Sequence, residues 1–105
     1  MRRFFVAGIG SGVGKTVISA ILTQAFNADY WKPIQCGHLE QPDSQTVTSL
    51  VSNEQTIVHP ESFKFSRELS PHAAAKLDGH QIEKEEIVLP KTKNNLVIEG
   101  TDGLL

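Results

Sequence analysis

The sequence predicts an α/β fold in which helices flank a parallel sheet. Apolar runs of strand length alternate with runs of helical periodicity, which is typical of parallel sheets covered by helices. A glycine-rich segment at residues 8–16 joins the first expected strand to the first expected helix. Three strands can be recognised in the sequence, whereas such sheets usually have about five or more, so we expect a partial sheet. The whole chain, 1–105, has the length of one domain.

The first strand is expected at residues 3–7, where an apolar run precedes the glycine-rich segment. The first helix is expected from about residue 15 to residue 26, because apolar side chains recur there at helical spacing. In an amphipathic helix such a stripe faces the core. The stripe comprises Val17, Ile18, Ile21, Leu22 and Ala25.

A second short strand is expected at residues 29–34, where a Lys-Pro pair marks its end. Proline favours extended geometry in the residue before it, which suits a strand end. A loop follows, and Asp43 with Ser44 forms a capping pair that predicts a helix through about Ser52.

A short helix is expected at residues 73–77, because a Ser-Pro pair precedes it and an Asp-Gly pair follows it. The stretch at 81–95 is polar and charge-rich, and we expect it to be solvated and helical only in part, around 82–88. Residues 96–99 form the third expected strand.

The glycine-rich segment has the signature of a phosphate-binding loop. In such loops backbone N–H groups converge on phosphate oxygens, and the positive end of the following helix faces the same anion. Lys15 would add positive charge, and Thr16 the hydroxyl that holds a magnesium ion. The loop is one residue longer than the common GxxxxGK[ST] form, and a flexible turn is the structural alternative. Nucleotide binding is therefore expected at Gly12, Val13, Gly14, Lys15, Thr16 and Val17.

Composition excludes several classes of partner. The net charge of −2, from 10 Lys plus Arg and 12 Asp plus Glu, lacks the basic excess that nucleic-acid binding requires, so no nucleic-acid partner is expected. Cys36 is the single cysteine, which cannot form an internal disulfide and suits a reducing cytoplasm. The four histidines show no zinc spacing with it. No segment approaches the roughly 20 apolar residues of a membrane span, so no membrane partner is expected.

Four segments resemble, in their order and local sequence, those of the dethiobiotin synthetase family: residues 8–16 with the longer loop, 32–37, 70–72 and 97–100. The resemblance covers nearly the whole chain, but only the N-terminal half of such an enzyme. It implies an ATP- and magnesium-dependent ligase of biotin biosynthesis that carboxylates 7,8-diaminononanoate with CO2 or bicarbonate, phosphorylates the carbamate and closes the ureido ring of dethiobiotin. The family's active site lies at a dimer interface, so the resemblance implies a homodimer or a complementary C-terminal fragment.

The resemblance also implies roles for single residues. Lys15 would contact the phosphates, and Lys32 would stabilise the carbamate and its phosphorylation, so these two are the implied catalytic residues. Thr16, Asp43 and Glu99 match the family's magnesium ligands, and oxygen ligands of this kind suit that hard cation. Asp43 and Glu99 are thereby also part of the expected ATP site.

Each further assignment has a structural alternative. Asp43 could serve only as a helix cap. Cys36 falls where the family commonly has a serine that contacts the diamine substrate, but a buried structural cysteine is an equal alternative. Glu99 ends an apolar strand and is harder to explain as structure, since carboxylates are seldom buried unpaired. His72 is expected as a wall residue near the substrate, with no acid or base role.

Two departures from the family pattern occur, at Gly10-Ser11 in the loop and at Thr101-Asp102 after the third strand. An Asp102 carboxylate directed at the phosphates would weaken ATP binding, because like charges at about 4 Å repel by roughly 1 to 4 kcal/mol. Two other functions remain open: a truncated or diverged nucleotide-binding homologue without turnover, and a regulatory ATPase of the partitioning kind. The segment at 32–37 argues against the latter.

Overall fold

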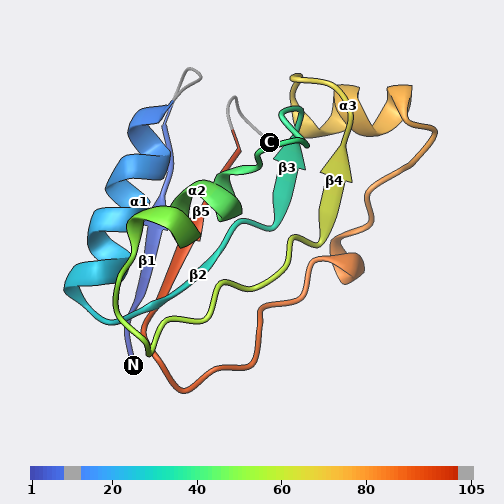
Figure 1. The fold of residues 1–105 in the computed structure, drawn as a ribbon. Coiled ribbons are helices and arrows are strands. Elements are labelled where there is room, and N and C mark those ends of the chain that lie inside the picture. The colour runs from blue at the N-terminus through green and yellow to red at the C-terminus, as the bar shows by residue number, and fades with distance from the viewer. Residues whose placement is uncertain (9–12, 102–105) are drawn as a thin grey trace.

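The computed structural model describes residues 1–8 and 13–101, and its fold is of the predicted α/β class (Figure 1). The main sheet has three parallel strands in the order β1-β5-β2. Because β5 pairs on both sides, its residues are mostly buried and its carboxyl end lies at the centre of one sheet edge. The strands are β1 (Arg3–Val6), β2 (Asp29–Trp31) and β5 (Leu96–Glu99).

The single strand expected at residues 29–34 is wrong, because the structure has a second, two-stranded parallel sheet that begins there. That stretch contains β2 and only the first residue of β3 (Ile34–Cys36), and the two strands belong to different sheets. Pro33 separates them because it has no N–H to continue a strand ladder; its carbonyl accepts a hydrogen bond from the N–H of Phe63 at 3.0 Å. The partner of β3 is β4 (Phe63–Phe65), which was not predicted because three residues carry too little periodicity.

The helix α1 (Val13–Ala25) packs on the sheet mainly through small side chains. Of the predicted apolar stripe, Leu22 packs against the core as expected, but the other members are exposed, so most of the stripe is wrong as the core face. Ile18 and Ile21 of that stripe are 52% and 60% exposed. The reason is close packing, since α1 contacts β5, α2 and both outer strands, where bulky side chains would hold the elements apart. Its buried residues are Thr16, Ser19, Ala20 and Thr23.

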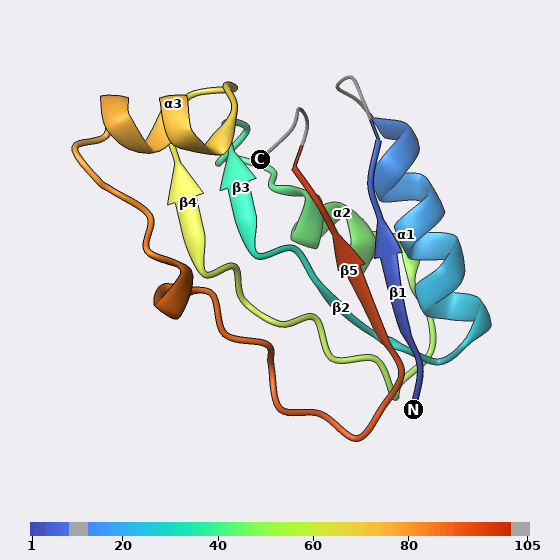
Figure 2. The ribbon, with the colours of Figure 1, turned by 180° about the vertical axis from the view of Figure 1, so that it is seen from behind.

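Both α1 and α2 (Asp43–Leu50) lie on the same face of the main sheet (Figures 1 and 2). The opposite face carries Phe5, Ile98 and Trp31 side by side in register, and Phe5 is 65% exposed. Figure 2 shows no helix of the described chain over this face of β1 and β5. The larger core therefore lies on the helix side alone, and it contains Val6, Ala20, Ala28, Tyr30, Val47 and Val97.

The start of α2 differs from the predicted capping pair. Pro42 occupies the cap position without a side-chain cap bond, and Asp43 is the first helical residue. Ser44 instead donates its hydroxyl to Glu61 Oε2 at 2.8 Å. The Asp43 carboxylate is therefore available for another partner, and helix capping does not explain it.

The remaining helical predictions are confirmed in part. The helix α3 (Pro71–Leu77) begins at the predicted Ser-Pro pair and packs on β3 and β4. The stretch at 82–88 contains only a short 3-10 helix, η1 (Lys84–Glu86). None of the helices in the described part of the chain has the length and apolar character needed to cross a membrane.

At the amino end of β2, the buried carboxylate of Asp29 joins three segments of the chain. It accepts hydrogen bonds from Thr92 at 2.6 Å, from Asn94 at 3.0 Å and from the Ile57 N–H at 3.1 Å, and it pairs with His59 at 2.9 Å. Burial alone would raise the pKa of Asp29, but the hydrogen bonds outweigh it and hold that pKa below its ordinary value. The ionised carboxylate is thus a structural junction opposite the candidate site.

Candidate functional site

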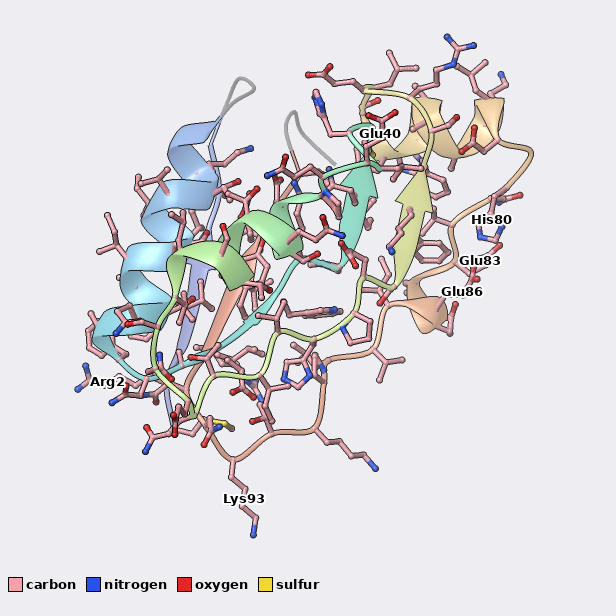
Figure 3. The ribbon with its side chains drawn as sticks, viewed as in Figure 1. Arg2, Glu40, His80, Glu83, Glu86 and Lys93 are labelled. Atoms are coloured by element: carbon pink, nitrogen blue, oxygen red, sulfur yellow. The ribbon has the colours of Figure 1, made fainter. Side chains whose placement is uncertain are left out.

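A cavity of about 1210 Å³ opens beside the carboxyl end of β5 and the start of α2. In parallel sheets with crossover helices, ligands bind outside this edge. Figure 3 shows Glu40, in the loop after β3, at the same end of the molecule, and Glu40 lines the cavity. The lining includes five of the expected site residues, Thr16, Lys32, Cys36, Asp43 and Glu99.

Glu99 is a buried carboxylate with a donor on each oxygen. It ends the central strand and is only 1% exposed. The Tyr30 hydroxyl donates to Oε1 at 2.7 Å, and the Thr16 hydroxyl donates to Oε2 at 2.9 Å. Burial raises the pKa of Glu99, while the Tyr30 bond and the Lys32 charge oppose that rise. A carboxylate held in this way is costly as structure alone, which supports a role in ligand binding.

Lys32 places one positive charge between two carboxylates. Its side chain is 7% exposed, and its ammonium forms a hydrogen bond and ion pair with Asp43 Oδ2. The same nitrogen lies 3.7 Å from Glu99 Oε2. Lys32 lies between β2 and β3, so the chain crossing from one sheet to the other brings the cation into the site. With both carboxylates ionised, the group carries one more negative charge than positive, which favours an added cation.

Asp43 is oriented by the helix start and by a glutamine that the sequence analysis did not single out. The Asp43 N–H donates to Gln35 Oε1 at 3.2 Å, and Gln35 Nε2 donates to the Gly37 carbonyl at 3.0 Å. Gln35 is 2% exposed in the middle of β3. A polar residue between two apolar ones in a buried strand was the sequence signal that could have identified it.

The donors in this corner fit a magnesium ion. Magnesium is usually held by one or two carboxylates together with waters and substrate phosphates. Asp43, Glu99 and the Thr16 hydroxyl supply that set, and the Thr101 hydroxyl oxygen at the cavity wall is buried without a hydrogen-bond partner among the described residues. Across residues 1–8 and 13–101 no group of three or more His, Cys, Asp or Glu side chains forms a metal site. A cation here would therefore depend on ligands from a bound phosphate or water.

The described part of the expected phosphate loop lies at the start of α1. Val13 begins the helix, and Gly14, Lys15, Thr16 and Val17 continue its first turns. The stem of Lys15 runs past Gly8 at the end of β1, where a Cβ would lie 3.5 Å from Lys15 Cδ. Lys15 therefore lies beside Gly8, two residues after the end of β1. Gly12, Gly10-Ser11 and Asp102 lie outside the described residues.

The outer wall of the cavity comes from β3 and the segment before α3. Cys36 ends β3, is half-buried and lines the cavity. At the rim, His38 Nε2 lies 3.2 Å from Glu68 Oε2. His72 is exposed and is not among the lining residues, so the expectation that it forms a wall is wrong: Ser70, before the helix, lines the cavity instead.

Comparison with known proteins identifies close sequence relatives. The family model described as an AAA domain matches residues 2–105. The ATP-dependent dethiobiotin synthetase BioD of Chlamydia pneumoniae is 49% identical over 105 residues, which is 100% of this chain and 47% of that protein. The protein of the same name from Christiangramia forsetii is 47% identical over 104 residues, 99% of this chain and 50% of that protein. The one from Cytophaga hutchinsonii is 46% identical over 106 residues, which is 100% of this chain and 51% of that protein. The chain spans about half the length of these relatives.

Proposed function

The chain belongs to the AAA domain family, and from that premise we propose that it is the nucleotide-binding part of an ATP-dependent dethiobiotin synthetase. The observation that carries the proposal is the convergence of Thr16, Lys32, Asp43 and Glu99 in one cavity beside the loop motif. The names of the relatives support the same reaction. The proposed substrates are ATP, 7,8-diaminononanoate and CO2 or bicarbonate, and the products are dethiobiotin, ADP and phosphate.

The nucleotide is proposed to bind with its phosphates over residues 12–17. Lys15 and the N–H groups at the start of α1 supply the positive potential that phosphate oxygens require. Thr16, Asp43 and Glu99 would hold a magnesium ion, which when bound neutralises phosphate charge. Asp43 and Glu99 thereby belong to the ATP site as well.

Lys32 is the proposed catalytic cation for the substrate half of the reaction. A substrate amine adds to CO2 and loses a proton to form a carbamate, whose oxygen then attacks the γ-phosphorus while ADP leaves. The second amine attacks the carbamoyl carbon, and phosphate leaves as the ring closes. Negative charge on the carbamate oxygens is stabilised best by a buried ammonium, and Lys32 is buried at the cavity wall. Cys36, at the outer wall, is proposed to contact the diamine.

Calorimetric titration with ADP and ATP, with and without magnesium, tests the nucleotide site. Lys15→Ala removes a charge-assisted contact worth about 1.5 to 3 kcal/mol, so affinity is expected to fall by at least tenfold. Lys93→Ala is the matched control, because it removes the same charge from an exposed position at the opposite end of the molecule (Figure 3). Equal binding by the Lys15→Ala variant and its parent contradicts the proposed loop.

The second candidate function is a nucleotide-binding homologue without turnover, which the names of the relatives do not favour. We propose that the chain acts in the cytoplasm, as its single cysteine suggests, and that a second copy or a complementary C-terminal fragment completes the site. A coupled assay with ATP, bicarbonate and the diamine separates the two functions. Product formation only after a complementary fragment is added supports the synthetase, and nucleotide binding without product in every combination supports the homologue.

A further inference from the structure

We propose that Tyr30 is a positioning residue that fixes the orientation of Glu99 for binding a divalent cation. This inference rests on the proposed function of the site, because it concerns how strongly Glu99 holds the metal. The juxtaposition that supports it is a buried phenol whose hydroxyl lies 2.7 Å from Glu99 Oε1, across a sequence separation of 69 residues.

The ring of Tyr30 belongs to the core, but its hydroxyl serves no packing purpose. Tyr30 is 0% exposed and lies in the cluster with Val47 and Val97. A phenylalanine would fill the same space, and a buried hydroxyl costs free energy unless it has a partner. Its partner is the carboxylate of Glu99, so the polar atom of this core residue points to the end of β5, at the cavity.

The bond leaves one oxygen of Glu99 for the cavity. Oε1 accepts from Tyr30, while Oε2 faces Thr16 at 2.9 Å and Lys32 at 3.7 Å. Rotation of the carboxyl group would exchange the two oxygens, and the Tyr30 bond opposes that rotation. Partners that hold a metal ligand from behind in this way typically change metal affinity by 10- to 100-fold when removed.

The first test compares the Mn²⁺ affinity of Tyr30→Phe with that of the parent chain, using Mn²⁺ as a paramagnetic probe in the presence of saturating ADP. We expect Mn²⁺ affinity to fall on the order of tenfold, while ADP affinity measured in EDTA stays within twofold of the parent. Thr23→Val is the matched control, because the Thr23 hydroxyl is also buried but donates to the Ser19 carbonyl within α1 at 2.7 Å. Unchanged Mn²⁺ affinity in Tyr30→Phe, or an equal loss in Thr23→Val, overturns the proposal.

The second test needs no substitution, because Tyr30 is the only tyrosine in the chain. Protein labelled with carbon-13 at the tyrosine Cζ gives one resonance for this residue. We expect that resonance to shift when Mg²⁺ is added to the ADP complex, with the same midpoint as Mg²⁺ binding measured by calorimetry. Binding of Mg²⁺ without any shift contradicts the role of Tyr30. A parent chain that binds ADP but no divalent cation contradicts instead the magnesium site of the proposed function, and this inference with it.

Discussion

At the scale of single residues, the candidate site depends on the balance between one buried lysine and two carboxylates. Lys32 pairs with Asp43 and lies 3.7 Å from Glu99 Oε2, so it contributes to folding as well as to the proposed chemistry. Removing one member of a buried pair leaves an uncompensated charge, which usually costs more than the pair itself contributes. Activity and stability must therefore be measured together for any substitution here.

Lys32→Ala is expected to abolish diamine-dependent turnover of a completed enzyme and to lower the free energy of unfolding by roughly 3 to 5 kcal/mol. Single-turnover kinetics and urea unfolding measure the two effects. Lys64→Ala is the control, since Lys64 lies 4.0 Å from Glu61 but its side chain is 56% exposed, so both quantities should change little. A folded Lys32→Ala variant with parental turnover removes this lysine from the mechanism.

Asp29→Asn is expected to destabilise the chain at neutral pH, by about 1 to 3 kcal/mol, because an amide cannot accept all the bonds that the carboxylate receives. The folded state lowers the pKa of Asp29 below 3.8, so its contribution is full above that value and is lost as the pH falls through the folded pKa. The stability gap between parent and variant should therefore narrow in acid.

Urea unfolding at pH 7 and pH 3 measures that gap. Asp78→Asn is the comparison, because hydrogen bonds from Ser66 also lower the pKa of Asp78, but Asp78 is exposed and its substitution should cost little at either pH. A gap for Asp29→Asn that stays constant down to pH 3 contradicts the assignment of an ionised junction.

At the scale of elements, the turn after β3 shapes the rim of the cavity. Gly37 has φ of +77°, and a Cβ there would lie 3.0 Å from the backbone of Glu68. Gly79, after α3, has a similar φ of +74° but nothing within 4 Å of a Cβ. The two glycines share a left-handed backbone conformation and differ in the space around a Cβ. Comparing substitutions at the two positions therefore separates the cost of the conformation from the cost of the steric clash.

Gly79→Ala is expected to cost about 1 to 2 kcal/mol of unfolding free energy from its left-handed backbone alone. Gly37→Ala is expected to cost at least about 1 kcal/mol more, because β3 and the Glu68 segment must move apart. Thermal and urea unfolding of both variants provide the measurement. Equal losses of unfolding free energy in the two variants would show that the segment at Glu68 moves aside at no measurable cost.

At the scale of the whole molecule, the helices of the described chain cover only one face of the main sheet, and the other face is exposed at Phe5 of β1. The free edge of β1 and the exposed Phe5 lie together on the other side. Sheets of this class normally carry helices on both faces, and open strand edges pair with other chains. We therefore expect the chain to associate with itself when no complementary fragment is present.

Phe5→Lys is expected to shift the chain toward monomer, because it places a charge on the uncovered face beside the free edge. Light scattering over a concentration series measures the mass. Leu77→Lys is the control, since Leu77 is similarly exposed, at 62%, but lies on α3. A parent chain that is monomeric throughout contradicts the prediction, and equal association of the parent and Phe5→Lys assigns the contact to another surface.

The sequence alone determined the fold class, the loop motif, β1, β5 and α3, and it placed Thr16, Lys32, Asp43 and Glu99 near one edge. These features follow from local patterns and from the rule that parallel strands end at a common edge. Helix boundaries were predicted less well: Ser44 of the expected α2 cap donates to Glu61 outside that segment, and the stretch at 82–88 forms only the short η1.

Only the tertiary structure decided which side chains share these positions. The outward direction of Ile18 and Ile21 depends on how closely α1 approaches β5 and α2. The β3–β4 pairing joins strands too short to show periodicity. The hydrogen bond between Tyr30 and Glu99 joins residues that are 69 positions apart, so no local sequence pattern predicts it. Contacts of this kind arise from packing of the whole chain, which is why the residues of the proposed site could be predicted from local sequence and the residues that contact them could not.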